Sequence, residues 1–341
     1  MAKILMIVSS ARAITLASGK PHPTGYWAEE VAKPLRHFKA AAAEVEIYTP
    51  DGQPPRADPY SLEPKFHHPD ADRDFLASVM RSFATDPEDV RITLEHLTEL
   101  NLIAARRVHQ ALVDAGMARP DATALVQRAA RQAWRTRSDF LSALSAESAA
   151  TDRLDLGRLQ SLVAEVDAAC VRRAGDMAAE LGAHSGLQNP KALASLTEAQ
   201  LQHFDAVFIP GGHGPMVDMT NNSEVARVIR HFHARRQPVA ALCHAPAALL
   251  SVGQDQEGRW LFDGYRMTAF LDEEEEQTII GKAGPPWWLE TDLKNAGGVF
   301  DPAPAWSSHV VIDRNLLTAQ NPGSSEAMAD ALLKKLEGVA A

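Results

Sequence analysis

The two ends of this chain alternate short apolar strands with helical stretches, and the middle of the chain does not. Strand-like apolar runs occupy residues 4–8, 45–48, 206–209 and 238–242, and helix-compatible stretches occupy residues 26–38 and 223–235. Such alternation is typical of a parallel sheet with helices on both faces. The ends of the chain are therefore predicted to form one α/β domain with a doubly wound, mostly parallel sheet.

The middle of the chain reads as helical. Residues 65–189 are rich in Ala, Leu, Arg, Glu and Gln, and apolar residues recur at helical spacing within 89–115, 121–144 and 154–181. We interpret residues 65–189 as a large all-helical insertion into a core of 1–64 and 190–341. The core then has about 215 residues, a common size for one domain. The insertion is expected to cap the active edge of the sheet or to mediate oligomerisation, and an independent helical domain is the alternative.

Composition excludes several classes of protein. Of the 341 residues, 45% are hydrophobic and 23% are charged, which is typical of a globular chain with a sizeable core. The formal net charge of -10 gives no reason to expect a nucleic-acid or anionic-membrane partner. No apolar run approaches the length of about 18 residues that a membrane-spanning helix needs, and the first residues lack the features of a signal peptide. A cytoplasmic location is therefore expected.

Only two cysteines are present, which excludes a disulfide framework. Cys170 lies in the middle of a predicted helix and is expected to be a small core residue. Cys243 lies between the strand 238–242 and a helical stretch, with Ala241 and Ala245 two residues away on either side. A nucleophile on a tight strand-to-helix turn needs such small neighbours. The following helix is expected to direct its amino terminus at the sulfur and so to lower the pKa of the thiol.

A glycine-rich loop follows the strand 206–209. It contains Gly211, Gly212 and His213, and glycines directly after a strand allow backbone N–H groups to face a ligand. We predict an oxyanion-stabilising or substrate-binding loop. A phosphate-binding loop is excluded because no Gly-Lys-Ser/Thr follows and the spacing does not match a dinucleotide fingerprint.

Two of these segments resemble the paired motifs of a known superfamily. They are Asp-Ala-Val-Phe-Ile-Pro-Gly-Gly-His-Gly-Pro-Met-Val-Asp at 205–218 and Ala-Leu-Cys-His-Ala-Pro-Ala at 241–247. They look like the PfpI-type, class I glutamine amidotransferase-like superfamily, and within it the branch of glutathione-independent glyoxalase III and heat-shock chaperones. Residues 24–34, 54–62 and 317–325 agree with the same branch, whereas the helical insertion matches nothing in it. The resemblance implies a flavodoxin-like fold.

The resemblance also implies roles for individual residues. Cys243 would be the nucleophile and His244 its neighbouring acid/base group. Glu30 would be the buried glutamate that is hydrogen-bonded to the sulfur. Glu29 is the competing candidate, although the spacing from Gly25 favours Glu30.

The acidic member of the Cys-His-acid set is implied to follow the predicted strand 266–270. The register there favours Glu275, with Glu274 as the alternative. Without the resemblance, this acidic run would be interpreted as a solvated turn.

The chemistry implied by the resemblance needs no cofactor. A thiolate would attack the aldehyde of a small reactive 2-oxoaldehyde such as methylglyoxal, and the product would be a 2-hydroxy acid, D-lactate. The alternatives are a cysteine-dependent peptidase or deglycase, and a holdase chaperone or redox stress sensor without turnover. A glutamine amidotransferase is disfavoured because the only histidine beyond His244 is His309, which is followed by Val-Val rather than x-Glu. The implied assembly is a homodimer.

Two histidine clusters offer possible metal ligands. His67 and His68 lie near Asp70 and Asp72, and a His-x-His pair occupies 231–233. Neither has the spacing of a zinc finger, and such clusters are common on protein surfaces. Some relatives of the branch hold a metal between two histidines and a carboxylate, but that set has no assigned counterpart in this sequence. The expectation is therefore no metal.

Overall fold

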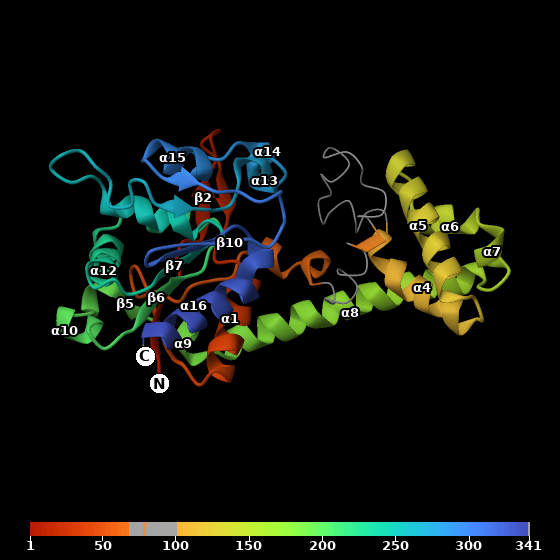
Figure 1. Cartoon of the computed structure of the whole chain (residues 1–341), viewed down its shortest axis with the longest axis horizontal. Helices are drawn as coiled ribbons and strands as arrows, with labels where there is room; N and C mark the ends of the chain where they lie inside the picture. The colour runs from red at the N-terminus through yellow and green to blue at the C-terminus, as the bar shows by residue number, and fades with distance from the viewer. Residues whose placement is uncertain (68–77, 80–100, 340–341) are drawn as a thin grey trace. The chain divides into compact units, whose positions relative to one another are not determined.

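The computed structural model describes residues 1–67, 78–79 and 101–339. These residues belong to two compact units, Met1–Ser61 with Met177–Ala341 and Leu62–Asp176 (Figure 1). The second unit contains most of the predicted insertion. The long helix α8 (Leu156–Ala183) begins in the second unit, and its residues from Met177 onward belong to the first unit. The helix expected over 89–115 can be followed only from residue 101, because 89–100 lie outside the described residues. A capping or oligomerising role for the insertion stays a prediction.

The first unit is built on a seven-stranded sheet with the strand order β10-β11-β7-β6-β1-β4-β5. Its strands are β1 (Lys3–Ile7), β4 (Glu44–Thr49), β5 (Lys191–Ala192), β6 (Ala206–Ile209), β7 (Val239–Leu242), β10 (Val310–Asp313) and β11 (Leu316–Ala319). All neighbouring strands run parallel except β10 and β11. The predicted doubly wound, mostly parallel α/β fold is confirmed. Because β1, β6 and β7 run parallel, the loops after them meet at one edge of the sheet.

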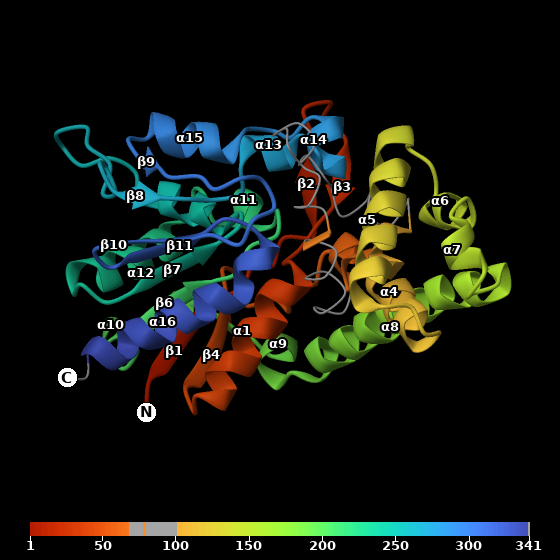
Figure 2. The same ribbon diagram turned by 45° about the vertical axis from the view of Figure 1, so that its right-hand side comes forward.

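Helices cover both faces of this sheet. The α-helices of the first unit are α1 (Ala28–Ala40), α9 (Ser185–Gln188), α10 (Glu198–Leu201), α11 (Pro215–Asp218), α12 (Ser223–Ala234), α13 (Asp272–Glu275), α14 (Ile279–Ala283), α15 (Leu289–Asn295) and α16 (Ser325–Val339). Short 3-10 helices are η1 (Pro59–Leu62), η5 (Leu193–Ser195), η6 (Ala245–Val252) and η7 (Pro322–Ser324). Helices α1 and α16 lie side by side (Figure 2), and α12 packs against η6 and against β6 and β7.

The apolar residues of the central strands explain this layering. Successive side chains of a strand point to opposite faces, so a strand buried on both faces needs an unbroken apolar run. Val207 and Ile209 of β6 join the core cluster that includes Ile229 of α12. Phe208, between them, packs edge-on against Phe38 of α1 with ring centroids 5.4 Å apart. The continuous apolar strands of the sequence are therefore those with a helix on each side.

Two small sheets complete the first unit. They pair β2 (Ala13–Thr15) with β3 (Pro21–Pro23) and β8 (Arg266–Met267) with β9 (Val299–Phe300). The strand predicted over 266–270 is therefore only two residues long, and it lies outside the main sheet. The residues after it are held by two backbone N–H groups: Thr268 N donates to Thr318 Oγ1 at 2.9 Å and Phe270 N donates to Cys243 O at 2.9 Å.

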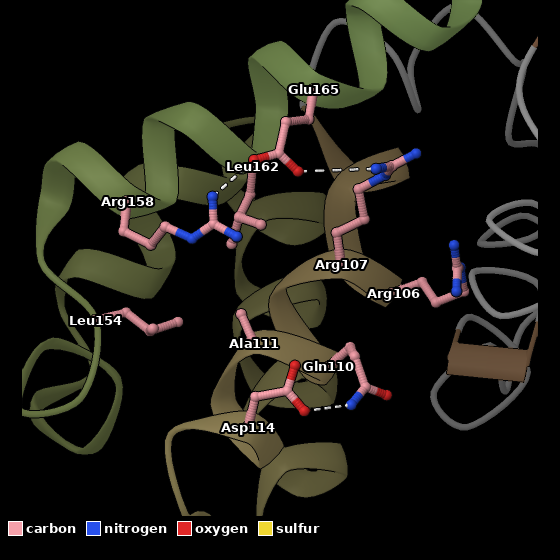
Figure 3. A pocket seen from close by; sticks show the side chains of 9 residues that line it. All are labelled: Arg106, Arg107, Gln110, Ala111, Asp114, Leu154, Arg158, Leu162 and Glu165. Carbon is pink, nitrogen blue, oxygen red and sulfur yellow. Dashed lines mark hydrogen bonds and ion pairs between the residues drawn. The ribbon is translucent and has the colours of Figure 1, made fainter.

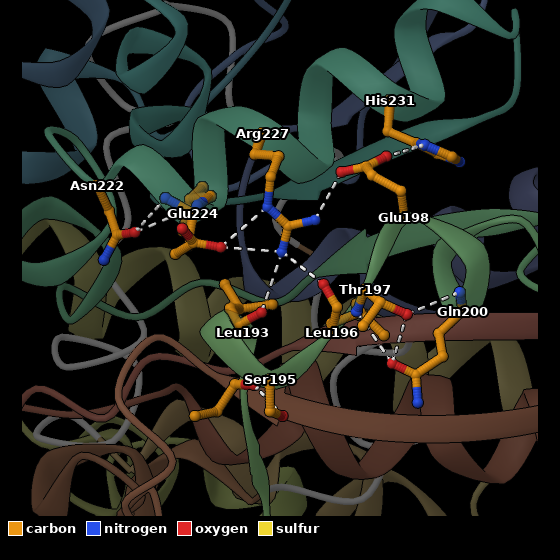
Figure 4. Close-up of polar contacts among 12 residues, drawn as sticks. Leu193, Ser195, Leu196, Thr197, Glu198, Gln200, Asn222, Glu224, Arg227 and His231 are labelled. Carbon is orange, nitrogen blue, oxygen red and sulfur yellow. Dashed lines mark hydrogen bonds and ion pairs between the residues drawn. The ribbon is translucent and has the colours of Figure 1, made fainter.

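Arg227 ties helix α12 to the segment before β6 (Figure 4). Its Nη2 donates to the carbonyl oxygens of Leu193 and Leu196 at 3.1 and 2.8 Å. The guanidinium also pairs with Glu198 at 2.8 Å and Glu224 at 2.9 Å. Because five donors in a fixed plane can hold several oxygens together, one arginine fixes the helix against this loop.

The second unit contains helices that bury their own core. They are η2 (Pro64–Phe66), η4 (Leu102–Ala104), α4 (Ala105–Asp114), α5 (Arg119–Thr136), α6 (Phe140–Ser145), α7 (Ser148–Thr151) and most of α8 (Leu156–Ala183). The helix expected over 121–144 is divided because Arg137 adopts a left-handed conformation with a φ of 52°. Asp139 then caps α6 by accepting from Ser142 N at 2.9 Å. Cys170 is buried in this core, as predicted.

Among the described residues, no helix is both long and apolar enough to cross a membrane.

Candidate active site

Cys243 occupies a strained turn directly after β7. Its φ is 62°, a left-handed conformation that non-glycine residues rarely adopt. The backbone is held on both sides, since Cys243 N donates to Ala319 O at 2.8 Å and Cys243 O accepts from Phe270 N at 2.9 Å. Ala241 and Ala245 are fully buried beside it. A strained nucleophile between a strand and a helix, with small neighbours, is the geometry of a nucleophile elbow.

The thiol begins a chain of three side chains. Cys243 Sγ lies 3.2 Å from His244 Nδ1, and His244 Nε2 lies 2.7 Å from Glu275 Oε2. An ionised carboxylate only accepts hydrogen bonds, so His244 must carry its proton on Nε2 when it faces Glu275. A neutral His244 then presents the lone pair of Nδ1 to the thiol. The arrangement has the nucleophile–base–acid order of a catalytic triad.

His244 is also fixed by an aromatic neighbour. Its ring stacks on Phe270 with ring centroids 4.3 Å apart. Phe270 in turn packs edge-on against Trp306, with ring centroids 5.6 Å apart. Phe270 belongs to the same segment whose N–H holds the Cys243 carbonyl. Stacking and hydrogen bonding together restrict the imidazole to one orientation.

Glu275 holds a second histidine. His213 Nε2 lies 3.0 and 3.1 Å from the two carboxylate oxygens, and Thr278 Oγ1 donates to Oε1 at 2.7 Å. The rings of His213 and His244 are 4.0 Å apart between centroids. Both rings and the carboxylate are buried.

The carboxyl group beside the sulfur is that of Glu30. Its Oε2 accepts a hydrogen bond from Gly211 N at 2.7 Å, and the carboxyl also interacts with the Cys243 sulfur. Oε1 is buried, and no hydrogen bond of ordinary length reaches it within the described residues. Glu29, the competing candidate, instead faces Lys33 on the same helix at 3.5 Å.

Gly211 must be glycine for steric reasons. A Cβ at this position would lie 2.5 Å from Leu242 O and 2.8 Å from both Glu30 Oε2 and His244 N. These distances are shorter than van der Waals contact. The missing side chain thus lets Glu30 and the residue after the nucleophile approach the same loop.

The state of the thiol differs from the expectation. Burial raises the pKa of Cys243 well above its ordinary value, and the neighbouring Glu30 carboxyl adds to the rise, although the N–H of Gly212 opposes it. The predicted lowering of this pKa is therefore wrong for the free protein. The residue is only 2% exposed, and this loss of water is the largest cause of the raised pKa.

Burial also keeps a proton on Glu30. Desolvation raises the pKa of Glu30 to about 8, against the opposing hydrogen bonds from Cys243 and Gly211. The carboxyl group is therefore mostly neutral at pH 7 and can act as a proton donor.

The two histidines on Glu275 differ in charge. Burial lowers the pKa of His244 to about 4, and the nearby charge of His213 contributes to the fall. For His213, burial also acts downward, but Glu275 and Asp58 outweigh it and raise the pKa. Burial acts upward on Glu275, yet the two histidines hold its pKa well below the ordinary value. His244 is thus a neutral base and Glu275 an anion.

The glycine loop serves groups of the protein itself. Gly211 N–H binds Glu30, and Gly212 N–H faces the Cys243 sulfur, so neither N–H is free for an oxyanion in this arrangement. The prediction of a ready oxyanion loop is corrected in this respect. His213 Nε2 likewise faces Glu275. A buried carboxyl group and a buried sulfur need hydrogen-bond donors, and the two loop N–H groups supply them.

Glu274 and Asp58 are buried carboxyl groups whose functions the sequence did not show. Glu274 was only the alternative to Glu275, and Asp58 was noted only as part of a matching loop. Asp58 accepts from Thr24 Oγ1 at 3.2 Å and from Tyr60 N at 2.9 Å, and it interacts with the charge of His213. Both segments were visible in the sequence, but no pattern distinguishes a buried acid from a solvated one.

Hydrogen bonds account for the arrangement of the groups that could meet at a metal ion. Among the described residues, His213, His244 and Glu275 have donor atoms within 4.8 Å of one another. The same atoms are joined by the hydrogen bonds given above. His231 and His233 do not form a site together, because His231 Nδ1 faces Glu198 and His233 Nε2 faces Tyr265 OH.

The other histidine cluster lies mostly outside the described residues. His67 is buried, whereas His68, Asp70 and Asp72 lie outside the described residues.

A surface hollow of about 340 Å³ lies in the second unit and is lined by residues of α4 and α8 and by Leu154 (Figure 3). In it, Glu165 faces Arg158 at 2.6 Å and Arg107 at 3.8 Å. These ion pairs are partly exposed, and such pairs add little to stability. The hollow contains none of the predicted site residues.

Comparison with known families gives two matches. A model of the DJ-1/PfpI family matches residues 156–335, just over half of the chain. A model of the adenylosuccinate lyase C-terminus matches residues 101–181, in the helical part.

Individual relatives match mainly one part of the chain. Glutamine amidotransferase-like class 1 domain-containing protein 1 of Bos taurus is 33% identical over 137 residues, covering 40% of this chain and 60% of that protein. Protein/nucleic acid deglycase HchA of Pseudomonas aeruginosa is 32% identical over 157 residues, covering 44% of this chain and 54% of that protein. The chain therefore spans little more than half the length of these curated relatives.

Solved structures show the same α/β fold. The rapid encystment protein of Francisella tularensis aligns with a TM-score of 0.57 at 19% identity, covering 98% of this chain and 99% of that one. Glyoxalase III of Candida albicans aligns with a TM-score of 0.55 at 17% identity, covering 98% and 96%. With the family match, the elbow cysteine and the parallel sheet, these findings assign the protein: it belongs to the DJ-1/PfpI family.

Proposed function

We propose that this protein converts a small 2-oxoaldehyde such as methylglyoxal into the corresponding 2-hydroxy acid, without glutathione. The observation that carries the proposal is the chain Cys243–His244–Glu275, with a protonated Glu30 on the other side of the sulfur. This arrangement provides a nucleophile, a base and an acid within one buried site, which is what an internal proton transfer between neighbouring carbons requires.

The first step forms a covalent adduct. His244 Nδ1 takes the thiol proton as Cys243 Sγ attacks the aldehyde carbon, and the former carbonyl oxygen accepts that proton to give a hemithioacetal. The raised pKa of the thiol suits this order, because the proton leaves only when the electrophile is present. The protonated carboxyl group of Glu30 lies beside the sulfur and would bind the second carbonyl of the substrate.

The second step moves hydrogen from C1 to C2. His244 removes the proton of the hemithioacetal carbon while Glu30 donates its proton to the C2 oxygen, which gives an enediol. Protonation of C2 and loss of the O–H proton leave a thioester of Cys243. Water hydrolyses the thioester, so methylglyoxal and water together give lactic acid and the free thiol. The atoms balance without any oxidant.

Deglycase activity is the second candidate. The relative from Pseudomonas aeruginosa is named a protein/nucleic acid deglycase. Release of a sugar-like aldehyde from an amine also begins with attack of a thiol on a carbon next to a carbonyl group, so the same side chains would serve it.

The test measures D-lactate from methylglyoxal without glutathione. The wild-type protein should produce it, and Cys243→Ala should abolish production. Cys170→Ala is the matched control, since this second cysteine is buried in the helical unit and should leave turnover unchanged. Turnover that survives Cys243→Ala would reject the thiol mechanism. A wild-type protein that makes no lactate, but suppresses aggregation as well as Cys243→Ala does, would support a chaperone instead.

A further inference from the structure

His213 is not a member of the chain Cys243–His244–Glu275, yet it is hydrogen-bonded to Glu275. Its Nε2 lies within 3.1 Å of both carboxylate oxygens, and its ring faces that of His244 at 4.0 Å. The side chain is buried. A polar ring that is buried and hydrogen-bonded to a buried carboxylate is expected to have a role other than packing.

The surroundings of His213 are acidic on two sides. Glu275 of α13 is in hydrogen-bond contact with His213, and the charge of Asp58, in the loop before η1, also acts on it. His244, from the turn after β7, is the other titratable group in contact. His22 in β3 interacts electrostatically with Asp58. Two carboxyl groups around one imidazole stabilise the imidazolium ion.

We propose that His213 is a positively charged positioning residue, which holds Glu275 ionised between two rings and so keeps His244 neutral with Nδ1 directed at Cys243. The inference deepens the proposed function and rests on it for the role of His244 as a base. Four side chains, Asp58–His213–Glu275–His244, then set the charge of the base, rather than Glu275 and His244 alone.

The physical argument concerns how the positive charge is shared. A lone His244 on Glu275 would gain a proton easily, because a carboxylate stabilises an adjacent imidazolium. Two imidazolium rings at 4.0 Å would repel one another, so only one of the pair holds the extra proton. His213 has Asp58 in addition to Glu275, and the pKa of His213 is accordingly raised while that of His244 is lowered.

The first test needs no variant and no substrate. In protein carrying ¹⁵N-labelled histidine, the imidazole nitrogens report the charge and tautomer of each ring. We expect His213 to be doubly protonated at pH 7, and His244 to be neutral with its proton on Nε2 between pH 5 and 8. A neutral His213 at pH 7, or a protonated His244, would overturn the inference.

The second test separates charge from hydrogen bonding. In His213→Gln, the amide N–H can still donate to Glu275, but the positive charge is lost. His244 should then titrate within the range from pH 5 to 8, and the acidic limb of kcat/KM should move up by about one pH unit or more. Asp58→Asn should shift both in the same direction by less. His233→Gln, whose histidine binds Tyr265, is the control and should shift neither.

The possible outcomes distinguish this inference from the proposed function. Expected ring charges without any lactate formation would leave the role of the four side chains in place and reject the glyoxalase proposal. Lactate formation with an unchanged His244 titration in His213→Gln would keep the glyoxalase proposal and reject the role of His213. If His213→Gln does not fold, the wild-type spectrum and Asp58→Asn still decide the question.

Discussion

Glu274 and Glu275 follow one another in the chain, but their carboxylates hold different parts of the site. Glu275 binds the two imidazoles of His213 and His244. Glu274 is fully buried and accepts hydrogen bonds from four groups of the neighbouring segments. Its donors are Leu271 N at 3.0 Å, Trp306 N at 2.5 Å, Gln320 Nε2 at 3.1 Å and Asn321 Nδ2 at 2.8 Å. Glu275 thus orients the two imidazoles, and Glu274 joins the segments that contain Leu271, Trp306 and Gln320.

Substitution by glutamine should separate these two roles. Glu275→Gln removes the anion that orients His244, so kcat/KM should fall by about 10²- to 10⁴-fold. Glu274→Gln turns an acceptor of four hydrogen bonds into a group with two donors of its own, and should cost about 1–3 kcal/mol of folding free energy. Steady-state kinetics measure kcat/KM for both variants, and urea unfolding measures their folding free energies. Greater loss of turnover in Glu274→Gln than in Glu275→Gln would contradict the assignment.

Gly211→Ala should disrupt the site through contact with the backbone. The new Cβ would lie 2.5 Å from Leu242 O, a backbone atom that cannot move without shifting β7. We expect loss of activity together with a lower melting temperature. Gly182→Ala is the matched control, because a Cβ there meets no atom of the described residues within 4 Å and alanine favours the helix by about 0.5–1 kcal/mol. Normal activity in Gly211→Ala would refute the close approach.

The buried carboxyl of Glu30 should make stability depend on pH. Its pKa is raised to about 8 in the folded protein, from an ordinary value of 4.5. The folded state therefore holds the proton more tightly, and its stabilising contribution is complete below about pH 4.5. Stability should fall as the pH rises through about 8, by several kcal/mol in total. Urea unfolding between pH 5 and 9 measures the slope.

Glu30→Gln should flatten this slope, since the amide cannot ionise but can still accept from Gly211 N. Glu29→Gln removes a carboxyl from the same helix and serves as the control; Glu29 pairs with Lys33 rather than facing the sulfur. The same Glu30→Gln variant should lose lactate production, because the amide has no acidic proton to give. An unchanged slope would show that Glu30 is ionised in the folded protein.

Alkylation of the thiol should be slow at neutral pH. Burial raises the pKa of Cys243, so little thiolate exists at pH 7 in the free protein. In a Cys170→Ala background, iodoacetamide should react with the remaining thiol more slowly than with free cysteine, and the rate should rise with pH. Mass spectrometry of the intact protein follows the reaction. A rate above that of free cysteine at pH 7 would show a preformed thiolate.

Local sequence patterns were enough to predict the layers of the fold. The apolar runs at β1, β6 and β7 specify strands buried on both faces, and the periodicity of α8 and α12 specifies helices. The turn at Cys243 was also predictable from local sequence, because a strand, a helical stretch and two flanking alanines are typical of a tight strand-to-helix turn. These features depend only on residues near one another in the chain.

Charge and contact at the site could not be predicted in this way. Glu30, Cys243 and Glu275 lie far apart in the sequence, and the pKa of each depends on how much water the others exclude. The sequence determined which residue types were available and in which elements they lie. Only the tertiary structure decided that the thiol keeps its proton, that Glu30 rather than Glu29 faces it, and that His213 shares Glu275 with His244. The physical reason is that desolvation and long-range pairing arise only when the chain has folded.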